Sequence, residues 1–322
     1  MDEQALLEDF QREPKVTGST DNLLTSPSHV ASSPFQVNLP TMDQTESFDN
    51  TPQPVASLPD WMSDLPDHLS ISRISIPGTH DTMSLFGGSN IRCQSWPLEA
   101  QLEAGIRFLD IRCKLEEGHF LIYHVNTYQE ADFSTVLKVT LSFLKRHPRE
   151  TVLMRVKEEL PILPDADFGP RLRRYLDEEG QGQVWVKEAI PTLGEARGKI
   201  VILEELENEI LGVPYEALSV GDSWHVLSAE SKWDRVLEHL DTAETTSHAT
   251  LHLTFCSGNG LFTNPEELAQ DINQRCYEHL KAQAGKAGRW GVVIMDFPGA
   301  GLIRNIVESN LKTGNDDTTA RL

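Results

Sequence analysis

The sequence has few positive charges for its length. Its 322 residues carry 28 Lys and Arg against 49 Asp and Glu, a formal net charge of −21. Nonspecific nucleic-acid binding needs a basic surface that replaces counterions, so this shortage argues against a nucleic-acid partner. It also argues against tight electrostatic adsorption to an anionic membrane. Any membrane contact must therefore be local and apolar, or brief.

The sequence is also poor in cysteine and in long apolar runs. Its four cysteines lack CxxC spacing, which favours reduced thiols in a cytosolic protein. No apolar run approaches the ~20 residues that a transmembrane helix needs. The acidic start, residues 1–4, lacks the basic and apolar regions of a secretory signal. We therefore expect a cytoplasmic monomer that associates with membranes only transiently.

The composition divides the chain into three parts. Residues 1–57 are rich in Ser, Thr, Pro, Asp and Gln, and they bury too little apolar surface to offset chain entropy. We expect a disordered N-terminal segment there and a disordered tail at 313–322. Residues 58–312 are expected to form a single folded domain.

Apolar runs of strand length alternate with segments of helical pattern in this domain. Strands are expected at 71–76, 108–114, 120–124, 151–156, 200–204, 251–256 and 292–296. Helices are expected at 97–104, 132–147, 169–179, 265–284 and 302–311. This alternation indicates an α/β fold with a parallel sheet and helical crossovers. Seven strands in a domain of this length favour a closed barrel over an open sheet.

Ionisable residues recur where these strands end: His80, Asp81, Asp110, Arg112, His124, Lys157, Glu158, Glu159 and Asp296. In barrels of parallel strands the active site gathers at the C-terminal strand ends. The first and last strands are neighbours in a barrel, so we expect Asp296 beside His80. Other interpretations stay open for some of them. Asp110 could pair only with Arg112, and Lys157 with Glu158 and Glu159 could form a solvated charge run.

This set of residues suits phosphodiester cleavage. Two histidines that titrate near neutral pH can supply the base for a nucleophile and the acid for a leaving alkoxide. The guanidinium of Arg112 matches two phosphate oxygens. Asp81 and Asp296 are candidates for the carboxylates that orient the two histidines.

Three stretches carry a resemblance to a known family. Residues 74–81 read ISIPGTHD, residues 101–112 read QLEAGIRFLDIR, and residues 123–124 read YH. Together they resemble the X-type catalytic domain of phosphatidylinositol-specific phospholipase C, in the short single-domain form of bacteria and fungi. Weaker matches follow at 144–152, 195–201 and 290–296. The resemblance spans about residues 58–311 and implies an irregular TIM-type barrel.

The resemblance implies a mechanism at matching positions. His80 would be the general base on the inositol 2-hydroxyl, oriented by Asp296. Arg112 would hold the phosphate, and His124, assisted by Asp81, would protonate the diacylglycerol leaving group. The substrate would be phosphatidylinositol or a related phospholipid at a membrane surface, and the products diacylglycerol and 1,2-cyclic inositol phosphate.

The resemblance also bears on metal and substrate binding. Calcium-dependent members carry an acidic residue where this chain has Arg112, so we expect no cofactor; Asp81, Asp110 and Glu158 would be the ligands if a calcium ion did bind. Glu205 stands where the short bacterial enzymes carry an arginine that contacts the inositol ring. An acid there would repel ring phosphates. The expected substrate-binding residues are Lys157, Glu205 and Trp233, the last as the ring-stacking aromatic.

Two other functions remain open from the sequence. One is a metal-dependent phosphodiesterase of a related barrel, acting on glycerophosphodiesters or sphingomyelin. The other is a weakly active module that binds a lipid headgroup or a partner protein, with the N-terminal segment as its interaction arm.

Overall fold

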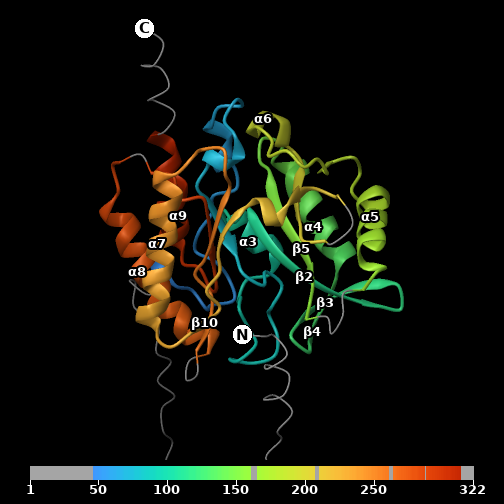
Figure 1. The fold of residues 1–322 in the computed structure, drawn as a ribbon, viewed down its shortest axis with the longest axis horizontal. Helices are drawn as coiled ribbons and strands as arrows, with labels where there is room; N and C mark the ends of the chain where they lie inside the picture. Colours follow the sequence, from blue (N-terminus) through green and yellow to red (C-terminus); the bar gives the residue numbers. More distant parts are fainter. Residues whose placement is uncertain (1–45, 161–164, 207–209, 261–263, 287, 313–322) are drawn as a thin grey trace, which may run out of the picture. The chain divides into compact units, whose positions relative to one another are not determined.

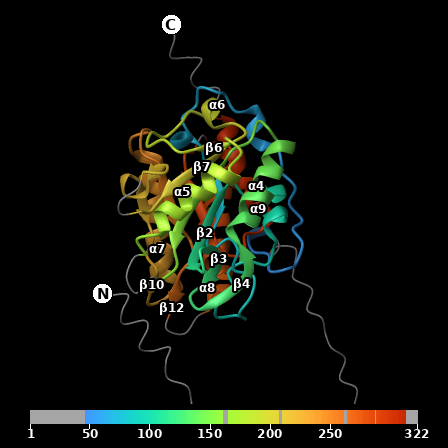
Figure 2. The same ribbon diagram turned by 90° about the vertical axis from the view of Figure 1, so that its right-hand side faces the viewer.

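The computed structural model of the protein describes residues 46–160, 165–206, 210–260, 264–286 and 288–312. The tail expected at 313–322 and most of the expected N-terminal segment, residues 1–45, lie outside these ranges. Within them, parallel strands alternate with helices along the chain (Figures 1 and 2).

A curled parallel sheet forms the wall of an irregular barrel, as predicted. In sheet order the strands are β6 (Val184–Trp185), β7 (Ile200–Glu204), β5 (Val152–Glu158), β2 (Phe108–Glu116), β1 (Ile76–Thr79), β13 (Val292–Met295), β11 (His252–Phe255) and β9 (Ser219–Gly221). β8 (Val213–Pro214) pairs with β7, and β10 (His225–Val226) pairs with β12 (Asn259–Gly260). Within the described ranges no backbone pairing joins β8 to β9, so the ring of strands is open there.

The helices pack outside the sheet, α7, α8 and α9 on one side and α4 and α5 on the other (Figure 1). Their bounds are α3 (Leu98–Ala104), α4 (Phe133–Arg146), α5 (Phe168–Glu179), α6 (Leu193–Ala196), α7 (Ala229–Thr245), α8 (Pro265–Ala282) and α9 (Ala300–Glu308), with 3₁₀ turns η1 (Trp61–Asp64), η2 (Ile71–Arg73), η3 (Tyr215–Ala217) and η4 (Ser309–Lys312). The side chains of Asp132 and Asn264 cap α4 and α8. None of the helices in the described ranges combines the length and apolar character that crossing a bilayer requires.

The first strand begins later than the sequence suggested. Residues 71–73 form the turn η2, and β1 runs from Ile76 to Thr79, so the Pro77–Gly78 pair lies inside the strand rather than in a loop after it. A Cβ added at Gly78 would lie 2.8 Å from Cβ of Phe108 on β2. Glycine is therefore needed where β1 and β2 come together, and the strand expected at 71–76 is wrong in all but its last residue.

The strand that carries His124 differs from the other barrel strands. β2 extends past the rim of the sheet, and β3 (His119–His124) folds back on it antiparallel, followed by β4 (Thr127–Asp132). Figure 2 shows the three strands side by side. His124 therefore reaches the C-terminal rim on a returning hairpin arm, not at the end of a parallel strand.

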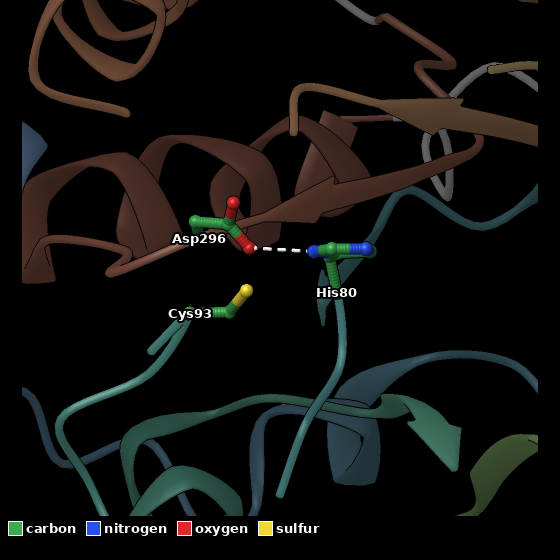
Figure 3. Close-up of side chains that lie close together, drawn as sticks. All are labelled: His80, Cys93 and Asp296. Carbon is green, nitrogen blue, oxygen red and sulfur yellow. Dashed lines mark hydrogen bonds and ion pairs between the residues drawn. The ribbon is translucent and has the colours of Figure 1, made fainter. Parts of the chain in front are cut away.

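The register of the central strands sets the positions of the polar side chains that follow them. Thr79 pairs with Met295 on one side and with Leu109 on the other. His80 directly follows β1 and Asp296 directly follows β13, so the two side chains face one another (Figure 3). The prediction that the first and last strands are neighbours is confirmed.

Part of the segment assigned to the disordered N-terminus packs on the barrel. Phe48 forms a backbone bridge with Pro298, and its ring lies 5.7 Å from that of Phe297. The N–H of Asp49 donates to the carbonyl of Phe297 at 3.0 Å. The boundary at residue 58 therefore moves toward the N-terminus, and the added residues contact the chain directly after Asp296.

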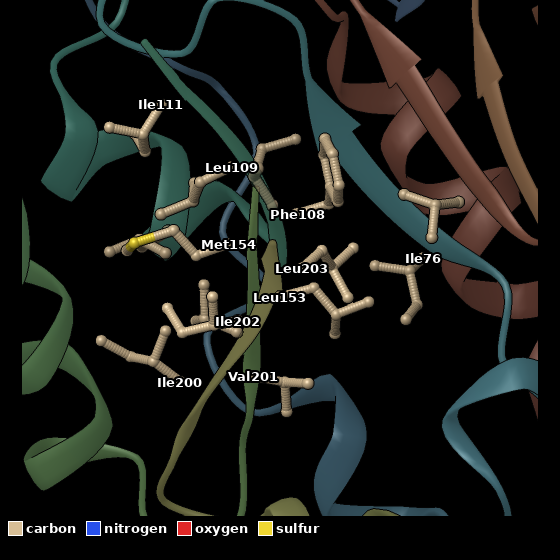
Figure 4. Close-up of a cluster of buried hydrophobic side chains, with 14 of the residues drawn as sticks. Ile76, Phe108, Leu109, Ile111, Leu153, Met154, Ile200, Val201, Ile202 and Leu203 are labelled. Atoms are coloured by element: carbon tan, nitrogen blue, oxygen red, sulfur yellow. The ribbon is translucent and has the colours of Figure 1, made fainter. Parts of the chain in front are cut away.

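Apolar side chains from β1, β2, β5 and β7 form the main core (Figure 4). Ile76, Phe108, Leu153 and Ile202 are among those with 0% exposure. Strands of this kind are covered on both faces, which explains why they read as continuous apolar runs. The rigid core holds the strand ends, and so the rim residues, in fixed positions.

Candidate active site

The C-terminal rim of the barrel brings together five expected residues: His80, Asp81, Arg112, His124 and Asp296. The most exposed of these side chains, Arg112, shows 12% of its surface, and the others 4% or less. The rings of the two histidines lie 6.3 Å apart, at 89° to one another. Charges in such a site act through little water, so their partners decide their protonation.

The contacts of His80 determine its tautomer. Its Nε2 lies 2.8 Å from Nη2 of Arg112, and its Nδ1 lies 2.9 Å from Oδ1 of Asp296. A guanidinium only donates hydrogen bonds, so Nε2 accepts, and the ring proton lies on Nδ1, which donates to Asp296. Burial, followed by the charge of Arg112, holds the pKa of His80 well below its usual value. His80 is therefore a neutral imidazole whose Nε2 lone pair faces Arg112.

His124 has the opposite arrangement. Its Nδ1 lies 2.7 Å from the carbonyl oxygen of Ile91, which only accepts, so Nδ1 carries a proton. Its Nε2 lies 3.2 Å from Oδ2 of Asp81. Oδ2 of Asp81 has no hydrogen bond of regular geometry, so the two groups form a close ion-pair contact when a proton is on Nε2. The His124–Asp81 pair can therefore hold a proton and give it away.

The carboxyl groups beside the histidines are hard to ionise. Burial raises the pKa of Asp81 to about 6, against the pull of Arg112 and His124. Burial, with the charge of Asp81, also raises the pKa of Asp296 well above its usual value. Asp81 has a positive φ of 42°, which turns its side chain between the histidines at a cost in backbone strain.

Arg112 lies among three carboxylates. Its Nη1 is 3.2 Å from Asp81 and 3.5 Å from Glu159, and its Nη2 is 3.1 Å from Asp110. Burial opposes ionisation of Asp110, but the charges of Arg112 and Arg155 outweigh it and hold the pKa of Asp110 below its usual value. The sequence interpretation that Asp110 pairs with Arg112 agrees with this contact.

The structure does not bring Glu158 to the site; Glu159 is there instead. Side chains alternate along β5, and Arg112 is in register with Lys157, while Cys113 is in register with Glu158. Lys157 therefore shares the face of Arg112, and Glu158 lies on the other face, where its Oε2 accepts from the N–H of Asp165 at 3.0 Å. Glu159 also accepts from the N–H of Val125 and so fixes the chain after His124. The alternation of side chains along the strand could have distinguished Glu159 from Glu158.

Sequence analysis also missed Arg155. Its guanidinium reaches Oδ1 of Asp110 at 3.3 Å and Oε2 of Glu205 at 2.6 Å, and it lies 4.4 Å from the ring centre of Tyr215. Arg155 is in register with Asp110 on the neighbouring strand. It therefore joins Glu205, which is 40% exposed, to the buried carboxylates of the site.

Trp233 is not at the site. It lies on α7, where it packs against His279 and the apolar cluster beneath that helix. The half-buried Trp224 is the indole beside the histidines, with its ring centre 5.4 Å from that of His80. Trp224 precedes β10, in a region where the sequence offered no clear pattern.

Known proteins resemble this chain in sequence and in fold. The model of the family "Phosphatidylinositol-specific phospholipase C, X domain" matches residues 70–205. The 1-phosphatidylinositol phosphodiesterase of Listeria monocytogenes is 33% identical over 273 residues, which cover 78% of this chain and 84% of that protein. The chain belongs to the phosphatidylinositol-specific phospholipase C family. The resemblance drawn from residues 74–81 and 101–112 is thereby confirmed.

Solved structures of this family have the same fold. The phosphatidylinositol-specific phospholipase C from Listeria monocytogenes superposes with a TM-score of 0.70 at 30% identity, covering 79% of this chain and 99% of that one. A double mutant of the Staphylococcus aureus enzyme gives 0.69 at 22% identity, covering 78% and 96%. The prediction of an irregular TIM-type barrel is confirmed.

Proposed function

We propose that the protein cleaves phosphatidylinositol to diacylglycerol and 1,2-cyclic inositol phosphate by acid–base catalysis. The observation that carries this proposal is the opposite protonation of two facing histidines. His80 offers a lone pair on Nε2, and the His124–Asp81 pair holds a proton. The names of the related Listeria and Staphylococcus proteins, both 1-phosphatidylinositol phosphodiesterases, support the substrate.

In the first step, Nε2 of His80 takes the proton of the inositol 2-hydroxyl, whose oxygen attacks the phosphorus. Asp296 accepts from Nδ1–H and stabilises the imidazolium that forms. Arg112, which contacts Nε2 in the free protein, turns to the phosphate oxygens when the hydroxyl takes its place. The attack is intramolecular, so the nucleophile is already in place.

In the same displacement the diacylglycerol oxygen leaves with a proton from the His124–Asp81 pair. The carbonyl of Ile91 keeps the other proton of His124 on Nδ1, so only the proton at Nε2 is free to move. Burial raises the pKa of Asp81 to about 6, close to neutral pH, which is the range in which a general acid can both hold and release a proton.

The reaction needs no calcium ion. The oxygen atoms that a hard cation would use, on Asp81, Asp110 and Glu159, already surround the guanidinium of Arg112 at 3.1–3.5 Å. The positive charge of Arg112, at this distance from all three carboxyl groups, would repel a calcium ion, so this donor set does not suit calcium. The same contacts weigh against a metal-dependent glycerophosphodiester or sphingomyelin phosphodiesterase.

The headgroup binds between Trp224 and Glu205. The indole beside His80 offers an apolar face to the ring, and Glu205, held by Arg155, accepts from ring hydroxyls. Lys157 lies on the face of β5 that carries Arg155 and adds a cation near the phosphate. An unphosphorylated inositol ring suits this pocket better than a polyphosphorylated one, because Glu205 repels ring phosphates.

The rim meets the lipid surface through exposed aromatic side chains. Phe86 and Tyr128 are 42% and 43% exposed, and Gln129 ties them together by accepting from the N–H of Phe86. This pair can enter a bilayer without basic residues. The four buried free cysteines support work in a reducing, cytoplasmic compartment.

Phosphorus NMR of the products tests the reaction. With phosphatidylinositol and excess chelator, we expect a cyclic phosphodiester signal; His80→Ala and His124→Ala should each lower its rate at least about 10²-fold. His119→Ala, an exposed histidine on the same hairpin, is the matched control and should keep full rate. Full activity in either active-site variant, or activity that returns only with calcium, would contradict the mechanism.

Vesicle assays test the docking pair separately. The double variant Phe86→Ser/Tyr128→Ser should lose most of its activity on vesicles and keep its rate on a short-chain, monomeric phosphatidylinositol. Equal losses on both substrates would show that the pair serves catalysis or folding instead of docking.

A further inference from the structure

A cysteine that the proposed reaction does not use lies between the two histidines. The side chain of Cys93 is buried, 3.8 Å from Nδ1 of His124, and faces His80 and Asp296 (Figure 3). Its backbone is fixed on both sides, because its N–H donates to Ser84 and its carbonyl accepts from Phe297. The thiol is therefore held toward the acid–base pair.

The donor atoms around this thiol have the spacing of a metal site. A nitrogen of His80, the sulfur of Cys93 and an oxygen of Asp296 all lie within 4.8 Å of one another. A second set, Asp81, Cys93 and His124, has the same spacing and shares the sulfur. Bonds of about 2.0–2.3 Å in a tetrahedral zinc site place donors roughly 3.3–3.8 Å apart, so side-chain rotations of about 1 Å close either set.

The charges favour a cation on this side of His80. Among the described residues, four buried carboxyl groups, those of Asp81, Asp110, Glu159 and Asp296, outnumber the three cations that act on them, the guanidinium groups of Arg112 and Arg155 and the buried ammonium of Lys232 near Asp296. Arg112 contacts Nε2 of His80, while Asp296 lies at Nδ1. An ion at Nδ1 is thus on the edge of the ring away from the guanidinium.

We propose that Cys93, His80 and Asp296 form an inhibitory site for a thiophilic divalent cation of the zinc class. The ion takes the lone pair of Nδ1, the thiolate of Cys93 and an oxygen of Asp296; the thiol proton goes to solvent and no oxidation occurs. The ring proton of His80 must then lie on Nε2, and Arg112, which can only donate, turns from that nitrogen to its carboxylate partners, so the base of the reaction is lost. A sulfur donor distinguishes this site from the oxygen donors that calcium prefers.

Metal binding is tested first, without substrate. Titration of the full-length protein with Cd²⁺ should give a thiolate-to-metal absorption band in the ultraviolet, which Cys93→Ala removes and the control Cys276→Ala keeps. Asp296→Asn, which leaves the thiol in place, should weaken Cd²⁺ binding at least tenfold. Wild-type protein without the band, or Cys93→Ala with an unchanged band, would overturn the proposal. Thermal unfolding of each variant verifies that it is folded.

Inhibition is tested second. After incubation with Zn²⁺, cleavage of phosphatidylinositol should fall more than tenfold and return on addition of chelator. Cys93→Ala should lose less than half of its own metal-free rate at the same Zn²⁺ concentration, and inhibition as strong as in the wild type would refute the site. The site goes beyond the proposed reaction. If the protein proved not to cleave phosphatidylinositol, the Cd²⁺ titration would still decide the metal site.

Discussion

At the residue scale, groups that only donate or only accept determine the protonation of this site. Arg112 can only donate to His80, and the carbonyl of Ile91 can only accept from His124. These two contacts give the histidines opposite roles before any substrate binds. They also mean that the roles depend on backbone and strand positions as much as on the side chains themselves.

The raised pKa of Asp81 predicts a pH-dependent stability. A carboxyl with a folded-state pKa of about 6 and an ordinary value of 3.8 favours folding below pH ~4, and this contribution is lost as the pH rises through 6. In the variant Asp81→Asn this side chain carries no charge at any of these pH values. Between pH 4 and pH 7 the free energy of unfolding of the wild type should therefore fall by about 2 kcal/mol relative to the variant. Urea unfolding at several pH values measures this; a constant difference would contradict it.

Glu205 predicts headgroup selection. Removing one negative charge near the ring should favour a ring phosphate by about 1.4 kcal/mol, a factor of about ten. We expect Glu205→Gln to raise the rate on phosphatidylinositol 4-phosphate relative to phosphatidylinositol by that factor. The exposed Glu216 provides the control Glu216→Gln, for which the ratio should stay constant. An unchanged ratio of the two rates in both variants would show that Glu205 does not contact the headgroup.

At the element scale, close packing of β1 on β2 predicts the effect of a methyl group at Gly78. Gly78→Ala should cost about 1–3 kcal/mol in unfolding free energy and lower activity by displacing His80, because the Cβ meets Phe108 at 2.8 Å. In Gly182→Ala nothing lies within 4 Å of the methyl, although φ is +70°. That control should cost about 1 kcal/mol and keep full activity. Denaturant unfolding and initial rates compare the two variants.

Most barrel strands were predictable because buried parallel strands are apolar throughout. The expected strand at 200–204 matches β7, and that at 292–296 is one residue longer than β13. The hairpin of β2 and β3 was not recognised as antiparallel. Its signal was Glu117–Gly118, two residues with φ of 49° and 79°, which form the tight turn of a two-residue hairpin without the usual Asn-Gly sequence.

Site residues were predictable where they directly follow a strand. They were less predictable where the alternation of side chains along a strand determines which residue faces the site. His80, Arg112 and Asp296 were found because strand ends of a barrel converge. Glu158 was chosen over Glu159 because a slip of one residue exchanges the two faces of a strand. Arg155 and Trp224 were missed, since their place depends on contacts with β2 and β1 that no local pattern encodes.

At the scale of the whole molecule, the charge of −21 opposes approach to an anionic lipid surface. Raising the ionic strength from about 10 mM to about 0.1 M shortens the Debye length from roughly 30 Å to 10 Å. At low lipid concentration we therefore expect faster cleavage of vesicles of pure phosphatidylinositol as salt is added. The effect should shrink when the substrate is diluted in phosphatidylcholine. A rate that falls with salt would point to a basic docking surface instead.

The pairing of β1 with β13 has a consequence for synthesis of the chain. His80 and Asp296 are 216 residues apart, yet they share one hydrogen bond. Contacts of such long sequence separation form late, because the intervening loop must close first. A ribosome delivers His80, Arg112 and His124 long before Asp296. The nascent chain therefore lacks the partner of its base until β13 has emerged, and the complete acid–base set forms only after that strand joins the sheet.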